Sequence, residues 1–190
     1  MYNIAMNHLK KNYLAGLILI FAIVGLIVSF ILTIEYLEIL KNPDAALSCN
    51  LNSVINCASV MKSNESHILG FPNPLMGLVY YTGVAIIALV ILTQGFVNRK
   101  LLYLVLLTSI GGFIFSYWLL FSSLFRIKAL CPYCVISCFS ATTIFFSMLA
   151  FLLKDKFGPK SKKWVLPLIA LFYLVVTGIV VLTINSYSVV

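Results

Sequence analysis

The sequence predicts an all-α integral membrane protein with five membrane-spanning helices. Composition is the first observation, since 62% of the 190 residues are hydrophobic, 9% are charged, and the mean hydropathy is +1.08. Soluble domains carry about 25% charged residues, so this chain is not an ordinary globular protein. The second observation is that five long apolar runs divide the chain. The length suits one compact bundle and leaves no room for a second folded domain.

The first apolar run, residues 13–34, follows a short polar segment of residues 1–12. A signal peptide has a shorter apolar core and a small-residue cleavage site, so we expect a retained anchor. Four further runs are long enough to cross a hydrocarbon core of about 30 Å at about 1.5 Å rise per residue. These predicted spans are residues 75–93, 101–125, 130–153 and 164–184.

The distribution of Lys and Arg indicates the orientation in a plasma or inner membrane. With a cytoplasmic N-terminus, the inside segments hold Lys10, Lys11, Arg99, Lys100, Lys154, Lys156, Lys160, Lys162 and Lys163. The outside segments hold Lys41, Lys62, Arg126 and Lys128, together with the acids Glu35, Glu38, Asp44 and Glu65. The positive-inside rule favours this orientation, with residues 154–163 as a basic cytoplasmic loop. The net charge of +8 then reports cytoplasmic loops rather than nucleic-acid binding.

The long connection between the first two spans, residues 35–73, is expected to be functional, because long loops between short-looped spans usually are. It faces the extracytoplasmic side, where disulfides form. Apolar residues at helical spacing in this loop are Val54, Ala58 and Met61. We therefore expect a short amphipathic helix at the membrane surface, ending near Gly70.

Cys131 and Cys134 stand at the start of the fourth predicted span. Two residues separate them, which is within disulfide reach if a helix begins there, and Pro132 suits the first helical position. A helix N-terminus lowers the pKa of a nearby thiol and increases its reactivity. Cys49 and Cys57 form a second pair in the long loop, facing the same compartment.

Two dithiol pairs on one side of a membrane suit an electron relay. Thiol–disulfide exchange proceeds through mixed disulfides, so a relay needs a mobile pair that meets a partner and a fixed pair beside an acceptor. Cys49/Cys57 fit the first role and Cys131/Cys134 the second. No Gly-rich dinucleotide motif occurs, and water-soluble nicotinamides do not easily reach the membrane edge. The sequence therefore favours a membrane quinone as acceptor and an extracytoplasmic thiol protein as donor.

Each cysteine pair also has a simpler interpretation. In that interpretation Cys131 and Cys134 form a structural disulfide or remain two inert thiols. Cys49 and Cys57 then form a disulfide that only stabilises the loop. The protein is then a non-enzymatic membrane scaffold or carrier. No metal site is expected, since seven intervening residues are not a usual zinc spacing and zinc needs four ligands. Cys138 is expected to be a small apolar packing residue.

The combination of these motifs resembles the vitamin K epoxide reductase family. It consists of Cys49 and Cys57, then Ser63, then Asn73 and Gly77 opening one span, then Cys131-Pro-Tyr-Cys134 opening another. The resemblance covers residues 13–153 and implies a four-helix bundle around a quinone. Residues 164–190, with the fifth span, are similar to microbial members and are expected to pack outside that bundle. Some microbial members carry a fused thioredoxin-like domain after it. This chain stops at Val190, so a separate partner is expected.

The resemblance also implies roles for individual residues. Cys134 contacts the quinone and Cys131 exchanges with the loop. Cys57 bridges to Cys131, and Cys49 forms the mixed disulfide with a thioredoxin-fold (DsbA-like) partner. The Asn73 amide hydrogen-bonds a quinone carbonyl, and the Ser63 hydroxyl holds the loop over the site. From the residues alone, asparagine before a helix is more often a turn or capping residue. Animal members usually carry tyrosine at the position of Cys138.

The resulting prediction is a membrane thiol–disulfide oxidoreductase. Its acceptor is a quinone of the ubiquinone or menaquinone (vitamin K) type, and its activity supports disulfide formation in exported proteins. An unrelated class of four-helix disulfide-generating quinone reductases shares this chemistry. In that class the close-spaced cysteine pair lies in the first outside loop, which is the reverse of the order here.

Overall fold

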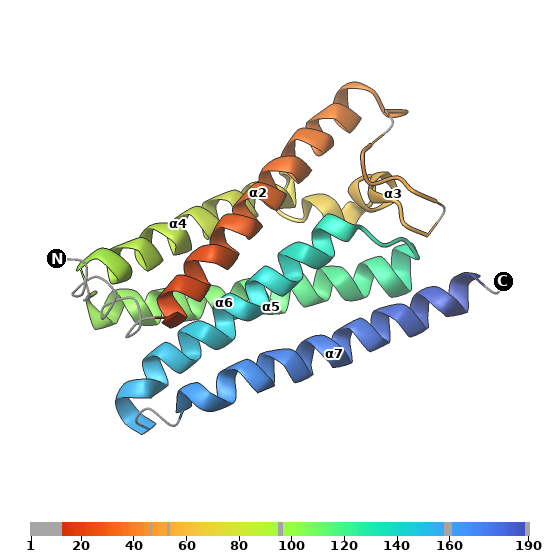
Figure 1. The fold of residues 1–190 in the computed structure, drawn as a ribbon. Helices are drawn as coiled ribbons and strands as arrows, with labels where there is room; N and C mark the ends of the chain where they lie inside the picture. Colours follow the sequence, from red (N-terminus) through yellow and green to blue (C-terminus); the bar gives the residue numbers. More distant parts are fainter. Residues whose placement is uncertain (1–12, 46, 53, 95–96, 158–160, 189–190) are drawn as a thin grey trace.

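The computed structural model describes residues 13–45, 47–52, 54–94, 97–157 and 161–188 (Figure 1). The predicted cytoplasmic segment 1–12 lies outside the described residues. Within the described residues, five helices are long and apolar enough to cross a membrane. They are α2 (Tyr13–Lys41), α4 (Asn73–Gln94), α5 (Arg99–Ser122), α6 (Pro132–Phe157) and α7 (Ser161–Ser188). The prediction of an all-α membrane protein with five spans is confirmed.

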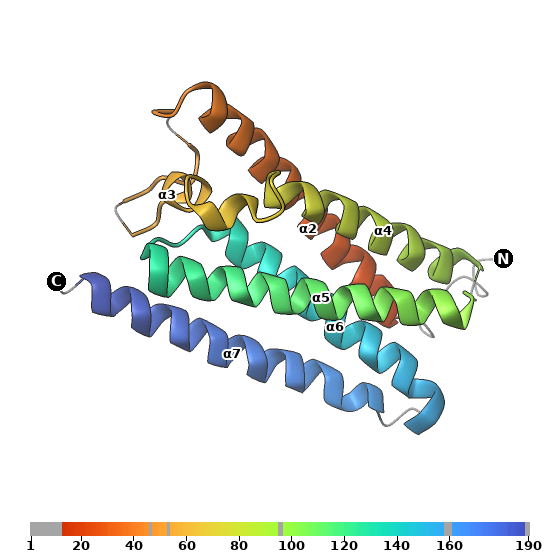
Figure 2. The ribbon, with the colours of Figure 1, turned by 180° about the vertical axis from the view of Figure 1, so that it is seen from behind.

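Helix α6 is the central helix of the described bundle. It contacts α2, α5 and α7, while α2 also packs along α4. Half of the residues in the most apolar stretch of α6 are buried, against 11% in α7. Figures 1 and 2 show α7 lying along the outside of the other helices. Four helices therefore form the bundle and α7 is peripheral, as expected.

Small residues allow α2 and α4 to approach closely. A Cβ atom at Gly25 of α2 would overlap the ring of Tyr81, and one at Gly77 of α4 would overlap the Ser29 hydroxyl. Small residues at helix contacts are typical of membrane bundles, because close packing replaces the hydrophobic driving force there. The Tyr81 hydroxyl then reaches α6, where it donates to the Ser137 carbonyl at 2.8 Å.

Helix α2 continues to Lys41, beyond the predicted end of the first span at residue 34. The prediction ended the span at the first charged residue, Glu35. A carboxylate does not break a helix, and Tyr36 and Ile39 are buried one turn apart on the same side. The helix ends where Pro43 follows, because proline disfavours helical backbone in the residue before it.

The other helix boundaries also differ from the predicted spans by a few residues. Helix α5 continues into a π-helical turn, Ser123–Ile127, which ends at Lys128 with a φ of 57°. At the opposite face of the membrane, residues 154–157 of the predicted basic loop still belong to α6 and residues 161–163 to α7. The connection there is therefore shorter than expected.

The expected loop helix consists of two short pieces rather than one helix. They are α3 (Cys57–Met61) and a 3₁₀ turn, η1 (Asn64–His67). Ser63 separates them because its backbone is extended, with a ψ of 156°. Gly70 has a φ of 81°, a conformation that favours glycine, and turns the chain toward α4. We call residues 57–70 the cap. The two ribbon views show it at the end of the bundle where α2 ends and α4 and α6 begin (Figures 1 and 2).

Candidate redox site

A backbone clamp holds the long loop against the start of α6. Ile55 and Leu130 form an isolated parallel β-bridge. The Leu130 N–H donates to the Val54 carbonyl at 2.7 Å, and the Asn56 N–H donates to the Leu130 carbonyl at 3.1 Å. Because Cys57 follows Asn56 and Cys131 follows Leu130, this clamp brings the two cysteines together. Sequence analysis did not predict it, since pairing of residues so far apart in the chain leaves no local pattern.

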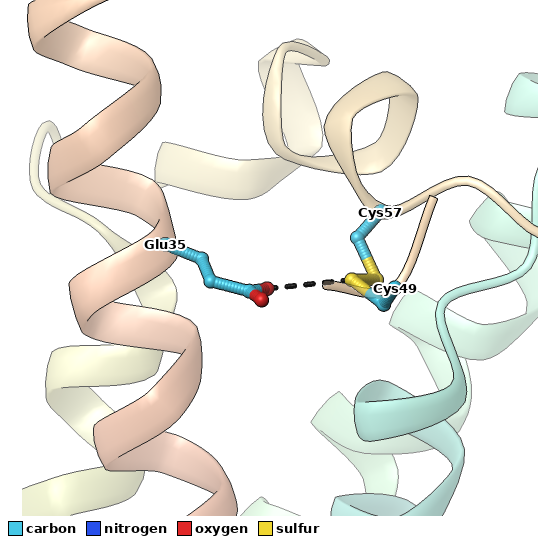
Figure 3. A group of neighbouring side chains, drawn as sticks. All are labelled: Glu35, Cys49 and Cys57. Atoms are coloured by element: carbon cyan, nitrogen blue, oxygen red, sulfur yellow. Dashed lines mark hydrogen bonds between the residues drawn. A yellow bond between two sulfur atoms is a disulfide. The ribbon is translucent and has the colours of Figure 1, made fainter. Parts of the chain in front are cut away.

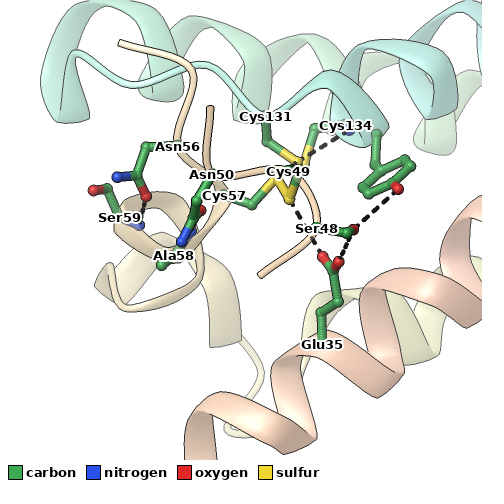
Figure 4. The surroundings of a disulfide bond; sticks show 11 residues. Glu35, Ser48, Cys49, Asn50, Asn56, Cys57, Ala58, Ser59, Cys131 and Cys134 are labelled. Atoms are coloured by element: carbon green, nitrogen blue, oxygen red, sulfur yellow. Dashed lines mark hydrogen bonds between the residues drawn. A yellow bond between two sulfur atoms is a disulfide. The ribbon is translucent and has the colours of Figure 1, made fainter. Parts of the chain in front are cut away.

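The sulfur atoms of the loop disulfide and of Cys131, the residue just before α6, are in contact (Figure 4). Cys49 and Cys57 form a disulfide with their Cα atoms 5.7 Å apart. The Cys57 sulfur lies 3.2 Å from the sulfur of Cys131, which is a free thiol. Both residues are buried, with 0% and 1% exposure. This distance places the Cys131 thiol next to a disulfide that it is able to attack.

Cys131 lies where its ionised form is stabilised. A hydrogen bond from the Cys134 thiol lowers the pKa of Cys131, and the backbone N–H groups of Tyr133 and Cys134 lower it further. The Cys134 N–H lies 3.3 Å from the Cys131 sulfur. Burial and the negative charge of Glu35 oppose this effect, and the net pKa is below the usual thiol value. This agrees with the expectation of a reactive thiol at the N-terminus of α6.

Cys134 borders a cavity of about 180 Å³ inside the bundle. Residues of α2, α4, α5, α6 and the cap line it, and most of the lining is apolar. Asn73 and Ser63, both predicted site residues, lie in this lining together with Tyr80 and Phe115. A cavity of about 150 Å³ accommodates a benzene ring in another protein, so a single quinone ring fits this space.

Asn73 joins the start of α4 to the cap. Its Nδ2 donates to the Glu65 carbonyl at 2.6 Å, and its Oδ1 accepts the Ile68 N–H at 3.3 Å. The side chain is buried at the cavity wall. An asparagine amide has two N–H donors, and the bond to Glu65 uses one of them. Asn73 thus fixes the cap to the start of α4, and its side chain also borders the cavity.

Two further contacts organise the cap. The Ser63 hydroxyl donates to the Val60 carbonyl at 2.7 Å, which tightens the turn between α3 and η1. The Glu65 carboxylate forms an ion pair with the Arg126 guanidinium at 3.2 Å. Since the Arg126 side chain is 65% exposed, solvent screens this pair and it contributes little.

Glu35 is a site residue that sequence analysis missed. It was counted only as an outside acid, yet its carboxylate is buried against the loop disulfide. One oxygen accepts a hydrogen bond from the Ser48 hydroxyl, and the other lies 3.3 Å from the Cys49 sulfur (Figure 3). The sequence did hold a signal for this buried acid. Glu35 ends an apolar run, and Tyr36 and Ile39 follow it at helical spacing, which indicates that the helix continues past the acid.

The carboxylate of Glu35 and the sulfurs of Cys49 and Cys57 lie within 4.8 Å of one another. Such a group could suggest a metal site. The two sulfurs are joined in a disulfide, so neither is the thiolate that a metal requires. We therefore interpret this cluster through its acid–base chemistry.

Cys138 lies one turn of α6 beyond Cys134. It is fully buried and packs among apolar residues of the α5, α6 and α7 helices, including Leu120, Val176 and Val180. Its carbonyl accepts a hydrogen bond from Thr142 within α6. These contacts agree with the expected packing role.

Comparison with known proteins decides the family. The model of the vitamin K epoxide reductase family matches residues 16–149, which include the clamp, the cap and all four site cysteines. The chain belongs to the vitamin K epoxide reductase family. No curated protein matches the chain. Membership confirms the predicted resemblance and indicates a membrane thiol–disulfide oxidoreductase. Helix α7 lies outside the matched region.

Proposed function

We propose that this protein oxidises a separate thioredoxin-fold (DsbA-like) partner and passes the electrons to a membrane quinone. The oxidised partner would then install disulfides in exported proteins. One observation carries the proposal: the sulfurs of Cys49, Cys57 and Cys131 lie in contact, and Cys134 follows at the cavity wall. The four sulfurs thus form a row from the buried loop disulfide to an apolar cavity.

The proposed relay has four thiol–disulfide exchanges, of which the first two take place with the partner. A partner thiolate attacks Cys49, forms a mixed disulfide, and is released as a disulfide, leaving Cys49 and Cys57 as thiols. The Cys57 thiolate then attacks Cys131 of a Cys131–Cys134 disulfide, which frees Cys134. Finally Cys49 attacks Cys57, which restores the Cys49–Cys57 disulfide and leaves Cys131 and Cys134 reduced. Each exchange forms one S–S bond and breaks one, so two electrons move inward per cycle.

The cavity is the proposed quinone site. Its apolar lining and its volume suit a ring of the ubiquinone or menaquinone (vitamin K) type, which accepts two electrons from the Cys131/Cys134 pair. Cys134 borders the ring space, Asn73 offers an amide N–H to a ring carbonyl, and Ser63 keeps the cap closed over it. The phenolic Tyr80 and the ring of Phe115 bound the same space from α4 and α5.

The proposed orientation places the cap and the row of sulfurs on the extracytoplasmic face of a plasma or inner membrane, with a cytoplasmic N-terminus. The distribution of basic residues supports it, since residues 99–100, 154–157 and 161–163 all lie at the end of the bundle opposite the cap. Cys49 is buried, so the loop that holds it would have to open before a thioredoxin-fold donor on that face could attack its sulfur.

The test uses detergent-purified full-length protein, a reduced thioredoxin-fold protein and a soluble quinone, with quinone absorbance as the readout. The parent is compared with Cys134→Ala and with Cys138→Ala, a matched substitution one turn along α6. We expect the parent and Cys138→Ala to reduce quinone and Cys134→Ala to lose activity. If the parent consumes no quinone with any reduced dithiol donor, the relay is refuted and the disulfide is a static staple.

A further inference from the structure

Glu35 is a buried acid whose recorded partners in the described structure are Ser48 and Cys49, both in the loop. Glu35 is 9% exposed as a residue and lies in the last two turns of a membrane-spanning helix. Burying a carboxylate is costly, so such groups in membrane helices usually serve a function. Figure 3 shows the side chain reaching from α2 toward the Cys49–Cys57 disulfide.

The contact between Glu35 and Cys49 matters for proton transfer. A disulfide sulfur has no proton, so in the oxidised loop the distance of 3.3 Å between the Glu35 oxygen and the Cys49 sulfur is only a close approach. When the disulfide is reduced, the Cys49 thiol has a proton at that position and a carboxylate within hydrogen-bond reach. A thiol must lose this proton before it attacks a disulfide.

The relative positions of the sulfurs identify the step in which Cys49 attacks. Cys57 is bonded to Cys49 and lies 3.2 Å from Cys131. The structure therefore matches the state reached when Cys49 has displaced Cys131 from Cys57. The Glu35 carboxylate lies next to Cys49, whose sulfur is the attacking atom in that step.

We propose that Glu35 is the general base for this exchange, a role that rests on the proposed relay. The Cys49 thiol transfers its proton to the Glu35 carboxylate and its sulfur attacks Cys57. The Cys49–Cys57 bond forms, the Cys57–Cys131 bond breaks, and the electron pair leaves on Cys131 as a thiolate. Glu35 holds the proton at the end of the step.

A path for the proton to leave is present. The Ser48 hydroxyl donates to the other Glu35 oxygen (Figure 4). Ser48 is exposed, and its hydroxyl lies 3.2 Å from the Tyr133 hydroxyl. The charge of Glu35 also acts on Cys131 and Cys134 of α6. Besides Cys49, the described structure also places Cys57, whose sulfur lies within 4.8 Å of the carboxylate, near Glu35, and the Tyr133 phenol lies beyond Ser48. Water at Ser48 is thus in position to return Glu35 to its ionised form.

The expected size of the effect follows from thiol ionisation. A free thiol has a pKa of about 8.5, so about 3% of it is thiolate at pH 7, and a local base gains at most about thirtyfold. A Glu35→Gln change also removes a negative charge that disfavours the thiolate, which offsets part of the loss. We expect roughly tenfold slower exchange at pH 7 and less than about twofold at pH 9, where most thiols ionise without help.

The experiment isolates this exchange without quinone or partner. Full-length Cys134→Ala protein is reduced and then oxidised with one equivalent of diamide, an oxidant of thiols. A diamide adduct on Cys131 is displaced by the neighbouring Cys57, which gives a Cys57–Cys131 disulfide. Acid quenching, alkylation and peptide mass spectrometry then follow its conversion to Cys49–Cys57. The comparison is between Glu35→Gln and Glu38→Gln, an exposed acid on the same helix.

We expect the Cys57–Cys131 species to persist about tenfold longer at pH 7 with Glu35→Gln and to convert at the parent rate with Glu38→Gln. Glu35→Asp keeps a carboxylate, so its rate should lie between the two. Parent-like conversion in Glu35→Gln, or a slow rate that pH 9 does not restore, would overturn the proposal. Because no quinone is used, this result is independent of whether the parent reduces quinone.

Discussion

Replacing Asn73 with alanine should open the cap, because this side chain pins it to α4 from inside the bundle. The substitution removes the 2.6 Å hydrogen bond to the Glu65 carbonyl and the acceptor of the Ile68 N–H. A buried hydrogen bond contributes about 1 kcal/mol, and the unpaired groups left behind add to the loss, so about 2 kcal/mol is expected in total. Since about 1.4 kcal/mol is a factor of ten, the open population of the cap rises about thirtyfold.

Hydrogen exchange measured by mass spectrometry tests this expectation. The amides of Ser66 and Gly70, which donate within the cap, report its opening. Arg126→Ala is the comparison, because it removes the other contact to Glu65 and leaves the buried pin in place. That ion pair is largely exposed, so its loss should cost about 0.5 kcal/mol or less and change exchange about twofold.

The outcome separates two roles of Asn73. Unchanged protection in Asn73→Ala, or a larger change in Arg126→Ala, would refute the reasoning that the buried amide holds the cap. An opened cap should also raise the Michaelis constant for a soluble quinone, because the cap closes one side of the cavity. A raised constant with full cap protection would instead assign Asn73 to the ligand alone.

Two further predictions concern the bundle and the thiols. Gly25→Ala should destabilise the protein by about 1–3 kcal/mol, since the added Cβ overlaps Tyr81, whereas Gly16→Ala on the same helix meets no atom within 4 Å and should be nearly neutral in thermal unfolding. The lowered pKa of Cys131 should keep its alkylation rate high as the pH falls below the usual thiol pKa. In Cys134→Ala the stabilising hydrogen bond is lost, so the midpoint of the alkylation profile should move to higher pH; an unmoved midpoint would contradict this cause.

The arrangement of spans followed from sequence because hydropathy is a local property. Each window of about 20 apolar residues demands a helix, since lipid offers no partner for backbone polar groups. The end of α2 did not follow, because a charged residue was taken as the edge of the membrane. Glu35 remains helical since Tyr36 and Ile39 beside it are buried, and that burial depends on the loop folding back.

The site was partly predictable for the same reason. The spacing of Cys131 and Cys134 is a local pattern, and the model of the family covers the region that contains them. The roles of the individual cysteines, and of Asn73 and Ser63, stay predictions. The Ile55–Leu130 bridge and the contact of Glu35 with Cys49 arise from tertiary packing and have no counterpart in a single sequence window.

The central claim is that electrons pass between the loop and α6 through Cys57 and Cys131. The most direct measurement uses the double variant Cys49→Ala, Cys134→Ala. In this variant Cys57 and Cys131 remain, and each has lost the other cysteine of its own pair. After mild oxidation and digestion without reductant, mass spectrometry should find a Cys57–Cys131 peptide in nearly all molecules, because the sulfurs lie 3.2 Å apart. Free thiols at both positions, or a link from Cys57 to another chain, would contradict the account.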